Sequence, residues 1–86
     1  MNISGLTEQI KFECDKPDPV FYYSSNGSLE FARKLVKKVG YGNIIYLPQL
    51  IHYVAEINGR LYDVNGDVTS LFSRYKKIYA SSIDML

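Results

Sequence analysis

The chain has 86 residues, a length that suits a single domain with one thin core. A hydrophobic share of 47% and eight tyrosines argue against disorder, and a formal net charge of +1 argues against a polyanion as partner of the whole chain. The single cysteine excludes an internal disulfide and any multi-cysteine metal site. With no secretory signal and no apolar run near the ~20 residues that span a membrane, we expect a cytoplasmic protein.

Residues 1–25 show a weak alternation of apolar and charged side chains. The apolar members of this alternation are Ile10, Phe12 and Cys14. Such a pattern predicts a short strand with one buried face. Two prolines follow and end it, because proline lacks a backbone donor, and residues 20–23 then fit a second strand or a buried extended segment. We expect extended or strand segments over residues 1–25 and a loop at residues 24–28.

A helix is predicted from Ser28 to Val39. Apolar residues recur at spacings of three and four, at Leu29, Ala32, Leu35, Val36 and Val39. Gly40 is placed to end the helix in the left-handed conformation. The basic residues fall mostly on the opposite side, at Arg33, Lys34, Lys37 and Lys38. A solvated face is the simplest interpretation of them. An acidic protein partner is the first functional alternative, and nucleic acid is disfavoured by the near-neutral chain.

Strands are expected over residues 43–47, 51–57 and 60–64. Asn58-Gly59 between the last two is a strong signal for a two-residue type I′ turn. This register makes His52 and Asp63 diagonal neighbours on one face, with backbones about 7–8 Å apart, a gap that one hydrogen bond between the side chains can close. The pair can be a general base with its orienting acid, or a structural histidine with a satisfied partner.

No cofactor or metal site is predicted. A metal site at His52, Asp63 and Asp67 would lack a second histidine or a thiolate. The segment from Asp63 to Asp67 begins like a calcium loop. Its glycine stands at the wrong position, however, and Arg74 replaces the bidentate carboxylate.

Residues 69–80 predict an amphipathic helix, followed by a tail over residues 81–86. Its apolar positions are Leu71, Phe72, Tyr75, Ile78 and Tyr79. Tyr75 and Tyr79 fit either the core, which we favour, or a partner-binding surface. The fold class is therefore α+β, a small antiparallel sheet of three or more strands with a central helix and a C-terminal helix. Residues 1–86 would form one domain around a helix-plus-hairpin core at residues 26–69.

The order of these parts resembles the papain-like cysteine hydrolase superfamily, in its small prokaryotic and viral, transglutaminase-like branch. Residues at the matching positions are Phe31, Ala32 and Leu35 on the helix and His52, Val54, Gly59, Tyr62, Asp63 and Gly66 on the hairpin. The resemblance covers about half of the chain. It implies a reduced papain-like arrangement in which a nucleophile at the helix start, His52 and Asp63 form the catalytic group.

The position of the family's nucleophilic cysteine is occupied by Ser28. A helix N-terminus and a nearby imidazolium lower the pKa of a thiol far more usefully than they activate a hydroxyl. Cys14 is no substitute, because it lies away from the helix start and is interpreted as a small core residue. The sequence therefore departs from the family at the atom that would attack.

Three functions follow from this pattern. The favoured hypothesis is a noncatalytic protein-binding module on a reduced papain-like scaffold, such as a phage or mobile-element protein that blocks a host target. A hydrolase or acyltransferase using Ser28, His52 and Asp63 is the enzymatic alternative. A small structural or assembly protein is the third.

Overall fold

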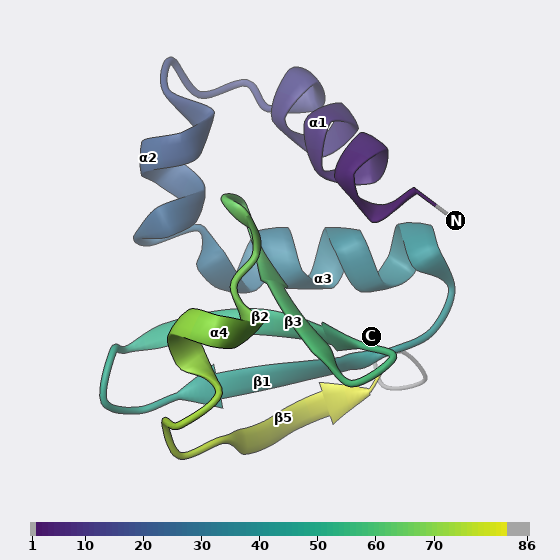
Figure 1. Ribbon diagram of the computed structural model, residues 1–86. Helices are drawn as coiled ribbons and strands as arrows, with labels where there is room; N and C mark the ends of the chain where they lie inside the picture. Colours follow the sequence, from purple (N-terminus) through teal and green to yellow (C-terminus); the bar gives the residue numbers. More distant parts are fainter. Residues whose placement is uncertain (1, 83–86) are drawn as a thin grey trace.

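The computed structural model describes residues 2–82 and has an α+β fold built on a five-stranded antiparallel sheet (Figure 1). The helices are α1 (Ile3–Glu13), α2 (Pro19–Ser24), α3 (Ser28–Val39) and α4 (Thr69–Phe72). The strands are β1 (Asn43–Leu47), β2 (His52–Ile57), β3 (Arg60–Asp63), β4 (Gly66–Asp67) and β5 (Ile78–Ser82), in the sheet order β4-β3-β2-β1-β5.

Residues 3–13 and 19–24 form helices α1 and α2, so the strand and extended segments expected over residues 1–25 are wrong. Asn2 caps α1 by accepting a hydrogen bond from the Gly5 amide at 2.9 Å. Asp18 caps α2 in the same way, and Pro19 occupies the first turn, where its missing donor costs nothing. The alternation was misleading because Phe12, which a strand would have buried, points into solvent.

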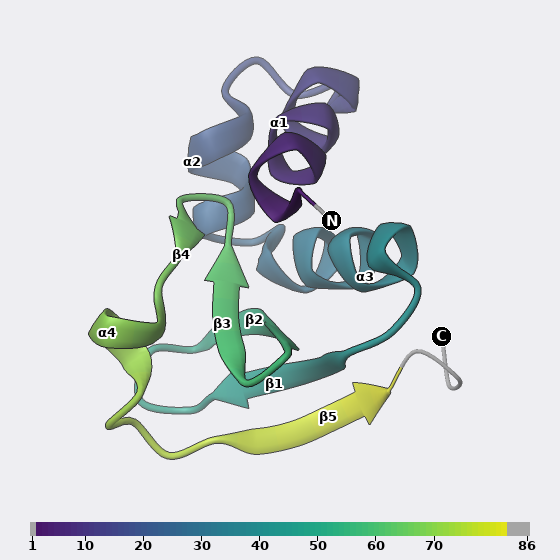
Figure 2. The ribbon, with the colours of Figure 1, turned by 45° about the vertical axis from the view of Figure 1, so that its right-hand side comes forward.

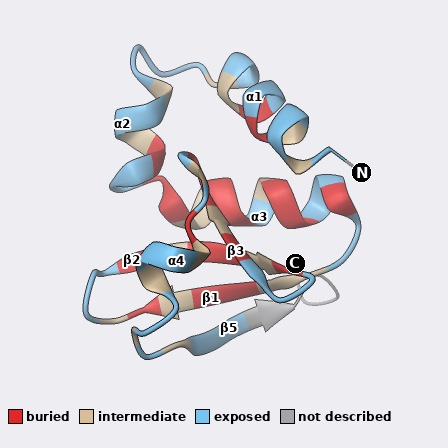
Figure 3. Cartoon of the chain, viewed as in Figure 1, coloured by how far each residue is buried: buried red, intermediate tan, exposed pale blue. Residues whose placement is uncertain are grey.

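Helices α1 and α2 lie on the side of α3 that faces away from the sheet, as Figures 1 and 2 show from two directions. The other side of α3 packs on β2 and β1. The buried residues between these layers, whose positions on the chain are among those coloured red in Figure 3, form the first core cluster. It consists of Ile10, Tyr23, Phe31, Ala32, Leu35, Val36, Val39, Ile44, Ala55, Ile57 and Val64.

The central helix and the hairpin agree with the sequence prediction. Helix α3 has the expected bounds and ends at Gly40, whose φ of 96° is left-handed. Asn58 and Gly59 also have positive φ values of 54° and 78°, as a type I′ turn requires. Ile57 pairs with Arg60 across the turn, so the expected register is confirmed.

The C-terminal helix expected over residues 69–80 is wrong beyond its first turn. Helix α4 ends at Phe72, and residues 78–82 form β5, which pairs antiparallel with β1. Residues 83–86 of the expected tail lie outside the described residues. The spacing of apolar residues allowed a helix. As a strand, residues 78–82 form backbone hydrogen bonds with the outer edge of β1, which would stay unpaired if these residues were helical.

A second core cluster fills the opposite face of the sheet. Its buried members are Ile45, Leu47, Val54, Leu61 and Val68, and Phe72 and Tyr75 pack against them. Successive strand residues point to opposite faces, which is why Ile44 belongs to the first cluster and Ile45 to the second. Any site built from residues of α3 and of the second cluster must therefore reach across the sheet.

Candidate functional site

His52 and Asp63 meet as the hairpin register predicts. His52 Nε2 lies 3.1 Å from Asp63 Oδ2, and both residues are buried, at 8% and 3% exposed. His52 opens β2 and Asp63 closes β3, so the tight turn between these strands brings the two side chains together. The sequence prediction of a hydrogen-bonded imidazole and carboxylate is confirmed.

The surroundings of this pair hold it in place. The His52 ring packs edge-on against Phe72, with ring centroids 5.8 Å apart. The second carboxylate oxygen of Asp63 accepts a hydrogen bond from the Asn65 amide at 2.8 Å, which closes the turn into β4. The pair thus ties β2 to the β3–β4 turn and lies under α4, on the face of the sheet that carries the second core cluster.

Ser28 lies at the start of α3 and is 4% exposed. Its hydroxyl oxygen accepts a hydrogen bond from the backbone amide of Tyr53 at 3.2 Å. The pairing of β2 with β3 ends at Ala55 and Tyr62, so Tyr53 lies beyond the last paired residue and Ser28 supplies its partner. Within residues 2–82 no hydrogen bond joins the Ser28 hydroxyl to His52. The structure therefore brings His52 and Asp63 together, whereas Ser28 is hydrogen-bonded to the backbone of β2.

Cys14 is half-buried at the C-terminal end of α1 and packs against the first core cluster. Its sulfur accepts a hydrogen bond from the Lys16 amide at 3.4 Å. The described residues contain no group of three histidine, cysteine or carboxylate side chains placed to hold a metal ion.

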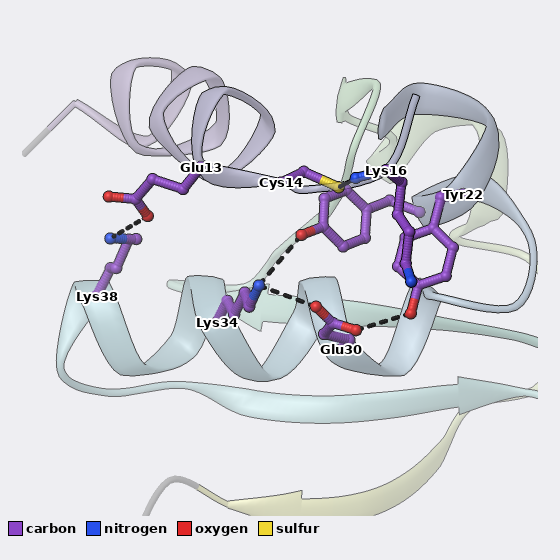
Figure 4. Close-up of polar contacts among 8 residues, drawn as sticks. Glu13, Cys14, Lys16, Tyr22, Glu30, Lys34 and Lys38 are labelled. Atoms are coloured by element: carbon purple, nitrogen blue, oxygen red, sulfur yellow. Dashed lines mark hydrogen bonds and ion pairs between the residues drawn. The ribbon is translucent and has the colours of Figure 1, made fainter. Parts of the chain in front are cut away.

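Two of the four basic candidates on α3 hold the helices together (Figure 4). Lys34 Nζ lies 2.9 Å from the Glu30 carboxylate and donates to the Tyr23 hydroxyl at 3.3 Å. Lys38 Nζ lies 3.2 Å from the carboxylate of Glu13 at the end of α1. These two lysines therefore link α3 to α2 and α1.

The titration behaviour of these groups reflects the same contacts. The hydrogen bond to Glu30 raises the pKa of Lys34, and in return Lys34 lowers the pKa of Glu30, with a smaller contribution from Tyr22. The Tyr22 hydroxyl donates to Glu30 at 2.8 Å, which raises the pKa of the tyrosine. Lys38 lowers the pKa of Glu13. The lowered pKa values keep Glu13 and Glu30 ionised at neutral pH, so both carboxylates remain acceptors for the lysines there.

Arg33 and Lys37 differ from their neighbours. Both are exposed, they stand one helical turn apart, and no ion pair to either is found within residues 2–82. Like charges at this spacing repel each other slightly in an isolated helix. They are the two cations of the predicted basic surface that the fold does not use.

The two tyrosine candidates have different positions. Tyr75 is half-buried and packs against Phe72, with ring centroids 6.1 Å apart, as part of the second cluster. Tyr79 is exposed on β5, and its hydroxyl donates to the Glu56 carboxylate at 2.9 Å, which raises its pKa. Tyr75 thus serves the core, and of the two only Tyr79 presents its ring to solvent.

A hollow between α2 and α3 was missed at the level of sequence. It has a volume of about 440 Å³ and is lined by Tyr22, Asn26, Leu29, Arg33 and Lys37 among others. A separate hollow of about 290 Å³ is lined by residues of α2 and the segments on either side of it, among them Phe21, and shares Tyr22 and Asn26 with the first. The available signal was Asp18-Pro19, an N-cap residue followed by a proline at the first helical position. Because the sequence analysis interpreted residues 20–23 as extended, it missed α2 and with it the hollow that α2 forms with α3.

Comparisons with protein-family models, with curated proteins and with solved structures found no match to this chain. The resemblance to papain-like enzymes therefore stays a prediction from the sequence. None of the helices within residues 2–82 is long and apolar enough to cross a bilayer.

Proposed function

We propose that this chain is a noncatalytic protein-binding module of the cytoplasm, built on a reduced papain-like plan. The observation that carries the proposal is the engagement of Ser28, whose hydroxyl, in a residue that is 4% exposed, accepts a hydrogen bond from the backbone of β2. A nucleophile needs its oxygen free for attack and within hydrogen-bond reach of its base. Ser28 meets neither requirement in this arrangement.

The His52–Asp63 pair supports the same conclusion. The imidazole uses Nε2 for Asp63 and is covered by Phe72. Asp63 also closes a turn through its second oxygen. Removing either partner would leave a buried polar group without a hydrogen bond, which gives the pair a structural role that is independent of any reaction.

Binding is supported by the apolar side chains on the outer helices. Phe12 on α1 is 90% exposed and Phe21 on α2 is 70% exposed. Burying a phenylalanine side chain gains about 1.5–3 kcal/mol, so exposing two of them forgoes stability that the monomer could have had. Aromatic residues of this kind are enriched at protein interfaces.

A serine-reactive phosphonate tests the noncatalytic part of the proposal. We expect no covalent labelling of Ser28, measured by mass spectrometry of the intact chain and its peptides. The competing hydrolase or acyltransferase function is favoured by one observation, the His52–Asp63 hydrogen bond. Labelling at Ser28 that disappears in the His52→Ala variant would establish that function and refute ours.

Selection from a random peptide library displayed on phage tests the binding part. We expect peptides to be enriched on the folded chain and to lose binding when Phe21→Gln removes the exposed ring. Leu71→Gln is the matched control, because Leu71 is similarly exposed at 62% but lies on α4. Enrichment that survives the Phe21 change and fails with the control, or no enrichment at all, would contradict the proposal.

The partner of the proposed module is another protein. In one version of the proposal this chain is a phage or mobile-element protein, and its partner is a host protein that it blocks. A small assembly protein is the alternative. In that case no library peptide would be selected, and light scattering would show a molecular mass that rises with protein concentration.

A further inference from the structure

We propose that the hollow between α2 and α3 is the binding groove of this module and that its partner is an acidic protein segment carrying an aromatic or large aliphatic side chain. This inference rests on the proposed function and adds the place and the chemistry of the partner. The groove is defined by Phe21, Tyr22, Asn26, Leu29, Arg33 and Lys37.

The shape of the groove suits one large side chain and its neighbours. The groove consists of two neighbouring hollows, of about 440 and 290 Å³, that share Tyr22 and Asn26 as lining residues. Leu29 and Tyr22 are half-buried and give apolar walls, while Phe21 stands exposed at one end. An apolar side chain of the partner can therefore be enclosed next to Tyr22 and lie against Phe21.

The walls of the groove are held rigidly. Tyr22 donates to Glu30, which is itself paired with Lys34, so a chain of bonds connects α2 to α3 across the floor (Figure 4). Lys16 Nζ lies 5.2 Å from the centre of the Tyr22 ring, in a cation–π contact. A preformed site loses little conformational entropy on binding, which favours affinity for a short segment.

The charges at the groove are unbalanced in a way that selects the partner. The hollow between α2 and α3 is lined by three cations, Arg33, Lys34 and Lys37, and by one carboxylate, that of Glu30. In the second hollow Lys16 and Asp18 balance each other. Lys34 is used by Glu30, and Arg33 and Lys37 form no ion pair within residues 2–82. At the Phe21 end, Asp18 also lines the hollow, but its carboxylate caps α2. The unmatched positive charge is therefore concentrated at the Arg33–Lys37 end.

A carboxylate of the partner would relieve the repulsion between Arg33 and Lys37 and gain two charge-assisted hydrogen bonds. The apolar wall fits a protein better than a nucleic acid. Two unpaired cations on a chain with a net charge of +1 would also release too few counterions to hold a polynucleotide at physiological salt.

Fluorescence polarisation with labelled synthetic peptides tests the proposal. The probe is a short peptide with a central phenylalanine flanked on both sides by glutamates, and two matched probes replace the glutamates by glutamines or the phenylalanine by serine. Single-stranded DNA of equal charge is a fourth probe. Each is titrated with the wild-type chain at low and at physiological salt.

The variant that removes the selecting charge is Arg33→Gln combined with Lys37→Gln. Its matched control is Arg74→Gln combined with Lys76→Gln, which removes the same charge from exposed positions outside the groove. All four positions are exposed, so both double variants should fold, which circular dichroism verifies.

We expect the acidic aromatic peptide to bind and the groove variant to weaken it about tenfold at low salt, with less than a twofold change in the control. The difference should shrink as salt rises, because exposed charges are screened. Equal binding of the neutral peptide, preferential binding of the DNA, or no difference between the two double variants would overturn the inference. If library peptides bind through Phe21 while Arg33 and Lys37 have no effect, the binding module stands and only the acidic partner is wrong.

Discussion

Ser28 offers the sharpest test of the structural interpretation, through the substitution Ser28→Ala. The change removes the hydroxyl that accepts a hydrogen bond from the Tyr53 amide at 3.2 Å and keeps the helix start otherwise intact. Tyr53 lies beyond the last residue pair of β2 and β3, so no strand residue takes over as acceptor on that side. The variant should therefore fold with one unsatisfied amide at the end of the sheet.

The size of the effect follows from the burial of that amide. An unsatisfied buried donor costs about 1–3 kcal/mol, and because Tyr53 is half-buried the lower part of the range, about 1–2 kcal/mol, applies. A small domain unfolds in urea with a slope on the order of 1 kcal/mol per molar, so the midpoint should fall by about 1–2 M. Tyrosine fluorescence or circular dichroism follows the transition, since the chain has no tryptophan.

Hydrogen exchange measured by NMR locates the effect. Protection of the Tyr53 amide should fall more than that of the neighbouring amides in β2, because its acceptor is gone. Ser70→Ala is the control, since Ser70 is exposed on α4 and its replacement should change the stability by less than about 0.5 kcal/mol. An unchanged urea midpoint together with unchanged Tyr53 protection would refute the reasoning and return the Ser28 hydroxyl to the list of free nucleophiles.

Three further predictions test the site and the backbone around it. Asp63→Ala removes the acceptors of both His52 and Asn65 and should cost about 2–4 kcal/mol in urea unfolding; a loss below about 1 kcal/mol would show that the buried pair is dispensable. Gly42→Ala should destabilise the chain by at least about 1 kcal/mol more than Gly40→Ala, since both have positive φ but only at Gly42 would a Cβ meet a backbone oxygen, at 2.8 Å; equal melting temperatures would contradict this. Asp67, whose pKa the Arg60 guanidinium lowers to about 2, stabilises the fold above about pH 4 and loses that contribution as the pH falls through 2. Asp67→Asn should therefore cost up to about 1 kcal/mol at pH 7 and only a small part of that near pH 2, and a pH-independent difference in unfolding free energy would reject the ion pair as its source.

The central helix and the hairpin were predictable because their signals are local. The turn at Asn58 needs two positive φ angles, which Asn and Gly adopt more easily than other residues, and Gly40 ends α3 for the same reason. Once the turn is set, the alternation of side chains places His52 and Asp63 on one face. That half of the candidate site follows from chain order and the geometry of a strand.

The N-terminal layer could have been predicted from caps rather than from alternation. Asn2 and Asp18 are both N-cap residues, and Ile10 is one of the side chains that α1 buries. The pattern of Ile10, Phe12 and Cys14 matched a strand by chance, since over so few residues a period of two and a period of 3.6 share positions. The groove was missed along with α2, because its outer wall belongs to that helix.

The sequence by itself determined the parts of this protein whose conformation depends on neighbouring residues, namely α3, the β2–β3 hairpin and the meeting of His52 with Asp63. Tertiary structure decided the rest. Residues 78–82 form β5 because β1 offers them a row of backbone partners. The Ser28 hydroxyl accepts a hydrogen bond from the Tyr53 amide because the pairing of β3 with β2 stops before it reaches Tyr53. Hydrogen bonds between distant segments are satisfied only in three dimensions, and here they determine which predicted site residues remain available to a partner.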